Sequence, residues 1–330
     1  MPELPEVETV VRMLRRRLLG AELGHVELLR PDIITRSHAP FAASIHGRTV
    51  SAIERRAKRI LIRLDNGATL GVHLGMTGQL TVVSANAPRQ PHTHLIIEVQ
   101  TGPASPLTRN PVAHASSRRS NTSTSPAESG AHPGSLLHFV PPCLRASIPS
   151  ASPPPACQLR FRDVRRFGEV WLDPDASRDE AGLGPEPLDL PTTQLAAILR
   201  RTTRAIKTAL LDQKLLAGLG NIYADEALFL ARIHPRTPAN RLTAAEVKRL
   251  NPAIKRVLRE AIANHGSTLR DYIDPNGDTG WYQTRHRVYA REHEPCCKCK
   301  TPIHRIVLGG RSTHFCPVCQ PATRRSNKLA

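Results

Sequence analysis

The sequence predicts an α+β multidomain protein, with an N-terminal helix and an antiparallel β-sandwich, then a helical region, then a zinc ribbon. Three observations predict this order. Strand patterns with turn signals prevail between residues 25 and 161, apolar residues recur at helical spacing after residue 195, and two Cys-x-x-Cys pairs stand near the C-terminus. A chain of 330 residues is long enough for two or three domains.

The charge of the chain indicates a polyanionic partner. The net charge is +18 and basic residues are spread along the whole chain, which favours nucleic acid. The sequence contains no run of 18 apolar residues, so no membrane span is expected. Arginines interrupt the first apolar segment, so no signal peptide is expected either. We therefore expect a cytoplasmic protein, in which seven cysteines suit a metal site better than a disulfide framework.

The first six residues hold the strongest candidate for chemistry. If Met1 is removed, Pro2 carries an α-amine with a pKa of about 7.7–8.0, so part of it is a neutral nucleophile at pH 7. The carboxyl groups of Glu3 and Glu6 stand close enough in the chain to move protons for it. The alternative is that this segment only starts a helix, because proline and acidic residues favour a first turn.

Local patterns then predict a helix followed by strands. An apolar stripe predicts a first helix that Gly20 ends: Val7, Val10, Val11, Leu14 and Leu18. Residues 59–64 and 68–74 flank Asp65-Asn66-Gly67, the strongest short signal for a β-hairpin. Lys58 lies in a basic run on the strand that feeds this hairpin, and such a run alone usually marks a solvated face.

Two glycine-bounded loops and one long insertion interrupt the strands. The loop 75–78 carries an apolar tip at Met76, and the loop 165–168 carries an aromatic tip at Phe167. Residues 103–155 are rich in Pro and Ser, so we expect a disordered insertion between two paired strands. In the helical region, a glycine-rich break at 218–221 separates two helices, and residues 243–246 form a capping-box signature.

The C-terminal cysteines predict one zinc ion. The ligands would be two pairs of thiolates with a hairpin between them: Cys296, Cys299, Cys316 and Cys319. Cys297 could replace its neighbour, but Cys296 gives the two-residue gap that such a knuckle requires. Four cysteine ligands indicate a structural rather than a catalytic ion.

Taken together, these motifs resemble the formamidopyrimidine-DNA glycosylase family. The resemblance covers residues 2–102 and 156–320 and rests on segments 2–6, 73–76, 165–168, 219–224 and 310–312, with Lys58. It implies a helix–two-turn–helix domain in the helical region. The expected domains are a catalytic sandwich at 1–180, the helix–two-turn–helix domain at 181–290, the ribbon at 291–320 and a basic tail at 321–330.

The resemblance also implies roles for the N-terminal residues. Pro2 would attack C1′ of a flipped nucleotide and form an imine, and Glu3 would act as the acid or base at the sugar ring oxygen. Glu6 would support the active site, and Lys58 would lie beside a phosphate of the damaged nucleotide. The segment 267–289 aligns with the region of the family's base-capping loop.

The remaining implied roles are DNA contacts. Three side chains would fill the gap left by the flipped nucleotide: Met76, Arg165 and Phe167. Core filling is the alternative for the methionine and the phenylalanine. Four further residues would hold the DNA or its phosphates, namely His73, Lys207, Asn221 and Arg311, although a lone strand histidine is usually structural and Lys207 alone would be an ordinary surface lysine.

The expected activity is that of a monomeric bifunctional DNA glycosylase and abasic-site lyase in base-excision repair. Its substrate would be double-stranded DNA that contains oxidised purines such as 8-oxoguanine and formamidopyrimidines, or abasic sites. The alternatives are a catalytically silent damaged-DNA-binding protein of the same fold, a zinc-ribbon protein that binds nucleic acid non-specifically, and an endonuclease VIII-like glycosylase for oxidised pyrimidines. Leu4 favours the purine enzyme, because the relative typically has glycine there.

Overall fold

The computed structural model describes residues 2–37, 40–100, 157–174, 182–267 and 280–322. The expected insertion at 103–155, most of the basic tail and the middle of the expected base-capping region lie outside the described residues. The boundaries expected for the domains stay a prediction.

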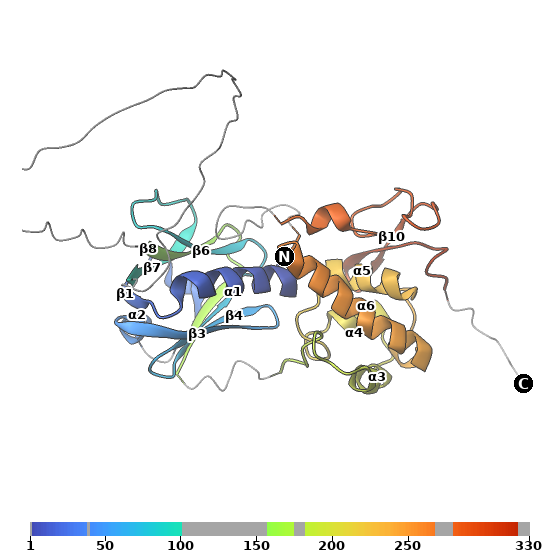
Figure 1. Cartoon of the computed structure of the whole chain (residues 1–330), viewed down its shortest axis with the longest axis horizontal. Helices are drawn as coiled ribbons and strands as arrows, with labels where there is room; N and C mark the ends of the chain where they lie inside the picture. Colours follow the sequence, from blue (N-terminus) through green and yellow to red (C-terminus); the bar gives the residue numbers. More distant parts are fainter. Residues whose placement is uncertain (1, 38–39, 101–156, 175–181, 268–279, 323–330) are drawn as a thin grey trace, which may run out of the picture. The chain divides into compact units, whose positions relative to one another are not determined.

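The predicted first helix is α1, Leu4–Leu18, and Glu3 is its N-cap. The side chain of Glu3 and that of Glu6 form a reciprocal capping box, which satisfies backbone N–H groups that the first turn leaves without partners. The helix ends before Gly20, whose φ of 76° lies in the left-handed region that glycine adopts without strain. Its apolar stripe packs against β3, β4 and β6 (Figure 1).

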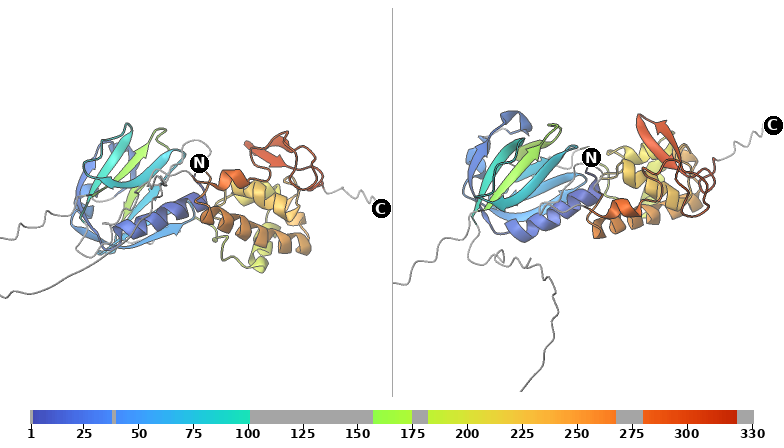
Figure 2. Two further views of the ribbon diagram at one scale, coloured as in Figure 1. Left: turned by 45° about the horizontal axis from the view of Figure 1, so that its top comes forward. Right: turned by 90° about the horizontal axis from the view of Figure 1, so that it is seen from above.

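The strands of the N-terminal half form a single sheet that folds over a shared core. The elements are β1 Glu22–Leu28, the 3-10 turn Pro31–Ile33, β2 Ile34–Arg36, α2 Phe41–Ile45, β3 Arg48–Arg56, β4 Arg59–Leu64, β5 Thr69–His73, β6 Gly78–Ser84, β7 Thr93–Gln100, β8 Cys157–Asp163 and β9 Glu169–Asp173. The strand order is β2-β9-β5-β4-β3-β1-β7-β8-β6. Apolar residues from both ends of this order belong to one core, as expected of a sandwich. Figure 2 shows these strands side by side in the N-terminal half.

The sandwich differs from the prediction in one respect. β2 and β9 pair in parallel, whereas every other described strand pair is antiparallel. The predicted hairpin is confirmed, because β4 and β5 pair across the Asp65-Asn66-Gly67 turn.

The helical region contains α3 Thr192–Arg200, α4 Ile206–Leu211, α5 Asn221–Ala231, the 3-10 turn Ala239–Arg241, α6 Ala244–Ala263 and the 3-10 turn Tyr282–Arg285. α5 packs against α4 and α6, and α3 also packs against α6. The predicted capping box of α6 is confirmed, since Thr243 and Glu246 exchange hydrogen bonds. Leu4 belongs to the apolar core of this region, whereas Val7 belongs to the sandwich core, so α1 is anchored in both.

The ribbon is a hairpin of β10, His304–Leu308, and β11, Arg311–Phe315, joined by Gly309 and Gly310. Both glycines have positive φ angles, which a two-residue hairpin turn of this kind requires. A small core around Phe229 and Val288 includes the cysteines of the ribbon.

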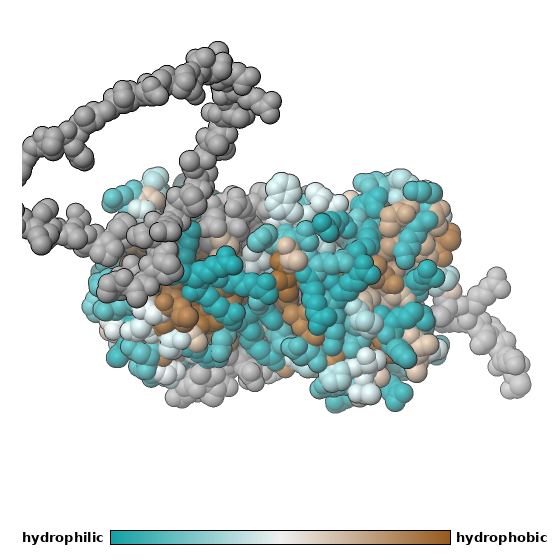
Figure 3. All heavy atoms as spheres, in the orientation of Figure 1, coloured by the Kyte–Doolittle hydropathy of each residue, from teal (hydrophilic) through white to brown (hydrophobic). Residues whose placement is uncertain are grey.

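In the part of the chain that the structure describes, none of the helices has the length and apolarity needed to cross a bilayer. On the face shown in Figure 3, hydrophilic residues cover most of the described surface and apolar residues appear in separate groups.

Candidate active site and nucleic-acid interface

Glu3 lies at a junction between two distant segments. Its Oε1 accepts a hydrogen bond of 3.0 Å from the backbone N–H of Ile222, in the first turn of α5. Gly220 permits this approach, because a Cβ on that residue would lie 2.2 Å from Cδ of Glu3. The side chain is buried, and its Oε2 has no hydrogen-bond partner among the described residues. The carboxyl is therefore held by one oxygen and leaves the other for a reacting group.

Burial raises the pKa of Glu3 to about 7. The positive charge of Lys58 lowers this pKa, the neighbouring Glu6 raises it, and the hydrogen bond from Ile222 lowers it. A carboxyl with this pKa is protonated in about half of the molecules near neutral pH, which is the condition for an efficient general acid.

Glu6 is the second buried carboxyl of the site. Its Oε2 accepts the N–H of Glu3 at 2.8 Å, and its Oε1 accepts the N–H of Ser267 at 2.7 Å and the hydroxyl of Tyr223. A Cβ on Gly266 would lie 2.7 Å from the same oxygen. Glu6 thus fixes the main chain of Glu3 relative to two segments of the helical region, which agrees with a supporting role.

Lys58 lies in the two-residue turn between β3 and β4, and not on a strand as the sequence predicted. Burial lowers the pKa of its ammonium, the charges of Glu3 and Glu6 raise it, and Arg311 lowers it. The turn is held by Glu186, whose carboxylate accepts the N–H of Ala57 at 2.6 Å and also binds the guanidinium of Arg55. The basic run is therefore not a solvated face, because Lys58 and Arg55 are both largely buried.

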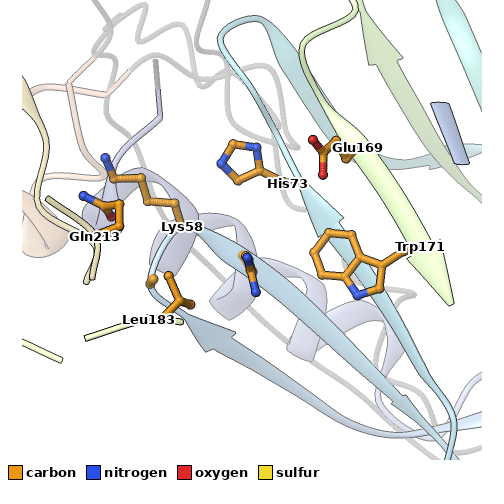
Figure 4. Close-up of a pocket in the computed structure, with 8 residues that line it drawn as sticks. Lys58, His73, Glu169, Trp171, Leu183 and Gln213 are labelled. Atoms are coloured by element: carbon orange, nitrogen blue, oxygen red, sulfur yellow. The ribbon is translucent and has the colours of Figure 1, made fainter. Parts of the chain in front are cut away.

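A pocket of about 300 Å³ adjoins Lys58. Figure 4 shows Lys58 and Gln213 at one end of it and His73, Glu169 and Trp171 at the other. His73 Nδ1 accepts the N–H of Gly75 at 3.3 Å, and burial lowers the pKa of its imidazole. A mostly neutral histidine beside Lys58 can donate to a phosphate oxygen without adding a permanent charge.

The three expected gap-filling residues lie on two adjacent loops. Met76 is 37% exposed and Phe167 is 54% exposed, so core filling is wrong for both. The guanidinium of Arg165 stacks 5.0 Å from the ring centroid of Phe167. An exposed apolar pair with an arginine is the combination needed to unstack a base step and contact the unpaired base.

Lys207 is not an ordinary surface lysine. Its side chain is fully buried, and its Nζ lies 2.7 Å from Oδ1 of Asp225 and 2.7 Å from the carbonyl oxygen of Ser312. The side-chain amide of Asn221 donates to the same carbonyl at 3.0 Å. Both residues therefore bind β11 next to the exposed Arg311, and their contact with DNA stays a prediction.

The four expected cysteines meet in the ribbon. All four sulfur atoms lie within 4.8 Å of one another, and the separations include 3.4 Å between Cys299 and Cys316 and 3.9 Å between Cys296 and Cys319. A tetrahedral ion with Zn–S bonds of about 2.3 Å requires sulfur atoms about 3.8 Å apart. The cluster therefore fits one structural zinc ion, and Cys297 is exposed and outside it.

Several contacts that build this site were not found from the sequence. Gly220 and Tyr223 belong to the motif segment 219–224, but their contacts with Glu3 and Glu6 have no local signal, because these partners are more than 200 positions away. Glu186 was not found at all, and its partner Ala57 is 129 positions away. Only the glycine-rich break before α5 could have indicated a close approach at this point.

Comparisons with known proteins agree with these features. Residues 1–114 match the family model of the formamidopyrimidine-DNA glycosylase N-terminal domain, residues 183–272 the H2TH domain of that enzyme, and residues 294–322 a zinc finger found in FPG and IleRS. The chain is 41% identical to formamidopyrimidine-DNA glycosylase of Herpetosiphon aurantiacus over 97% of its length and 100% of that protein. It is 38% identical to formamidopyrimidine-DNA glycosylase of Bacillus subtilis over 97% of its own length and 99% of that protein.

Solved structures give the same result. A complex of Lactococcus lactis Fpg with DNA that contains an abasic site matches with a TM-score of 0.74 at 31% identity, over 97% of this chain and 100% of that one. MutM (Fpg) of Thermus thermophilus matches with a TM-score of 0.71 at 36% identity, over 97% of this chain and 98% of that one. The chain therefore belongs to the formamidopyrimidine-DNA glycosylase family, whose members are DNA glycosylases that repair damaged bases by base excision.

Proposed function

We propose that this chain is a bifunctional glycosylase and abasic-site lyase that removes oxidised purines from double-stranded DNA through an imine with Pro2. The observation that carries the proposal is the Glu3 carboxyl. It directly follows the proposed nucleophile, it has a pKa of about 7, and its Oε2 is unpartnered among the described residues. These properties suit a group that delivers a proton to a sugar oxygen at neutral pH.

The proposed reaction begins after the damaged nucleotide has left the base stack. The amine of Pro2, once Met1 is removed, attacks C1′, and the bond from C1′ to the base breaks with its electron pair going to the base. The proton that the amine loses neutralises the departing base. Glu3 protonates the ring oxygen O4′, the ring opens, and the secondary amine gives a cationic iminium. Loss of a proton from C2′ then expels the 3′-phosphate, a second elimination expels the 5′-phosphate, and water releases the sugar fragment from Pro2.

The charged residues of the site fit the phosphates that leave. Arg311 is close enough to Lys58 for its charge to lower the pKa of that ammonium, so the two cations would hold adjacent phosphates from two sides. A bound phosphate would relieve this repulsion, and it would stabilise the ammonium of Lys58 that burial disfavours. Zinc would keep the ribbon folded, and thereby keep Arg311 in place.

The choice of oxidised purines and of DNA as the partner follows from the relatives. Lactococcus lactis Fpg has been solved with DNA that contains Fapy-dG and with DNA that contains an abasic site. A silent damage-binding protein would need a disabled Glu3 or a blocked Pro2, and an endonuclease VIII-like enzyme would prefer oxidised pyrimidines. We also propose that the enzyme is monomeric and acts in the bacterial cytoplasm.

Borohydride trapping tests the proposal. The purified protein is incubated with a duplex that carries one 8-oxoguanine opposite cytosine, and the mixture is reduced and digested for peptide mass analysis. An adduct on the peptide that begins with Pro2 is expected. A protein that lacks Met1, contains zinc and forms no adduct would not be a lyase, and the silent binder would replace this proposal. Faster excision of thymine glycol than of 8-oxoguanine would favour the pyrimidine enzyme.

A further inference from the structure

Asp163, the last residue of β8, is a fully buried carboxylate that belongs to none of the roles described above. Its Oδ1 accepts the hydroxyl of Thr77 at 2.5 Å and the N–H of Arg165 at 3.2 Å. Its Oδ2 accepts the N–H of Gly168 at 2.7 Å. All three donors belong to the two loops that carry Met76, Arg165 and Phe167.

The main chain of Asp163 is itself held in place. The imidazole of His94 forms a 2.7 Å hydrogen bond to the carbonyl oxygen of Asp163. The backbone N–H of Asp163 donates to the carbonyl oxygen of His92 at 3.1 Å. His94 is the second residue of β7, and His92 is the residue before this strand. The main chain of Asp163 is therefore held by the sheet and not by either loop.

The two loops touch each other as well as the carboxylate. The hydroxyl oxygen of Thr77 accepts the N–H of Arg165 at 3.1 Å, so this hydroxyl bridges the loops. A Cβ on Gly75 would lie 2.4 Å from the carbonyl carbon of Phe167, and the φ of 61° at Gly75 favours glycine. The two loops therefore lie in close backbone contact at Gly75 and Phe167.

We propose that Asp163 is a positioning residue that locks these two loops into one rigid wedge, with the Thr77 hydroxyl as the link between them. This inference rests on the proposed function, because the wedge acts only if the enzyme flips a nucleotide out of a duplex. Hydrogen bonds to a buried carboxylate are stronger than those between neutral groups, and they hold the loops before DNA arrives.

A rigid wedge matters for a physical reason. Three side chains on two loops must enter the same gap in the base stack, and unstacking costs several kcal/mol per base step. If the loops are already locked together, the DNA contacts do not have to offset the entropy cost of ordering them. A preformed abasic site in single-stranded DNA needs no unstacking, so its reaction with Pro2 does not depend on the wedge.

The test compares Thr77→Val, Thr77→Ser and Asp163→Asn with wild-type protein. Asp65→Asn is the matched control, since Asp65 is exposed in a turn of the same sheet and accepts one backbone N–H. Single-turnover excision of 8-oxoguanine from a duplex is measured beside borohydride trapping on a single-stranded abasic oligonucleotide. A duplex with 2-aminopurine opposite the lesion reports the unstacking of the unpaired base.

We expect Thr77→Val and Asp163→Asn to slow duplex excision by about 10- to 100-fold, the factor that corresponds to lost hydrogen bonds to a charged group. Their 2-aminopurine signal should rise more slowly, and trapping on single-stranded abasic DNA should match wild type. Thr77→Ser keeps the hydroxyl and should restore duplex excision, and Asp65→Asn should leave both reactions unchanged.

Thr77→Val also tests the inference if Asp163→Asn does not fold. Wild-type excision rates in Thr77→Val would overturn the inference, and so would an equal loss in duplex excision and single-stranded trapping. If wild-type protein forms no adduct on either DNA, the proposed function fails and the inference fails with it. Active wild type with an unaffected Thr77→Val rejects the inference alone.

Discussion

The backbone N–H of Ile222 donates to Oε1 of Glu3 across 3.0 Å, although the two residues are 219 positions apart in the chain. The N-terminus of a helix favours a negative charge, so this contact partly offsets the burial of the carboxyl. It also orients the group, because the bonded Oε1 leaves Oε2 for a reaction partner. The acid of the proposed reaction is thus completed only when α5 packs against the start of α1.

Glu3→Gln should abolish base excision and retain much of the reaction with abasic DNA. The amide keeps the shape but cannot protonate O4′, and general-acid catalysis contributes about 10²–10⁴-fold. Single-turnover excision of 8-oxoguanine measures the first step, and borohydride trapping on an abasic duplex measures the second. Glu22→Gln, at an exposed position of β1, is the control. Wild-type excision by Glu3→Gln would remove Glu3 from the acid role.

Gly220→Ala should damage the site through a single atom. The φ of −136° at Gly220 is open to alanine, so the cost arises from the Cβ, which would lie 2.2 Å from Cδ of Glu3. We expect a loss of about 1–3 kcal/mol in unfolding free energy, as overpacking typically costs. Denaturant titration should show that Glu3→Ala in the same chain recovers most of this loss. An additive double variant would mean that the clash is with another group.

The raised pKa of Glu3 should also make stability depend on pH. The folded carboxyl has a pKa of about 7 against an ordinary value of 4.5, so its contribution is complete below pH 4.5 and is lost as pH rises through 7. At 1.36 kcal/mol per pKa unit, the loss is at most about 3 kcal/mol. Denaturant midpoints of wild type and Glu3→Gln at pH 5 and pH 8 measure it. On going from pH 5 to pH 8, the denaturant midpoint of Glu3→Gln should rise relative to that of wild type.

The sequence could predict what local signals encode. The hairpin at Asp65-Asn66-Gly67, the Thr243–Glu246 capping box and the cysteine knuckles each depend on a few consecutive residues. The parallel pairing of β2 with β9 and the burial of Lys207 depend on segments that meet only in the folded chain. The same holds for the Asp163 carboxylate, whose partner Thr77 is 86 positions away.

The two adjacent cysteines of the first knuckle should behave differently. Cys296→Ser should lose zinc, because Cys296 is buried in the sulfur cluster, whereas Cys297→Ser should retain it, because Cys297 is exposed outside the cluster. Zinc content by atomic emission and affinity for a lesion duplex measure both effects. Loss of zinc should weaken DNA binding, since Arg311 lies on the hairpin that the ion stabilises. Equal zinc loss in both variants would mean that the ligand set is wrong.

Lys207→Met should destabilise the fold rather than only weaken DNA binding. Removing one partner of a buried ion pair leaves Asp225 charged and uncompensated, which typically costs about 3–5 kcal/mol. Lys207→Met with Asp225→Asn should be more stable than Lys207→Met alone, because neither position then carries a charge. Lys248→Met, on the exposed side of α6, is the control. Denaturant midpoints measure stability, and affinity for a lesion duplex is measured on the same preparations. If Lys207→Met keeps the wild-type midpoint and loses only affinity, its ammonium contacts DNA directly and the buried pair contributes little to the fold.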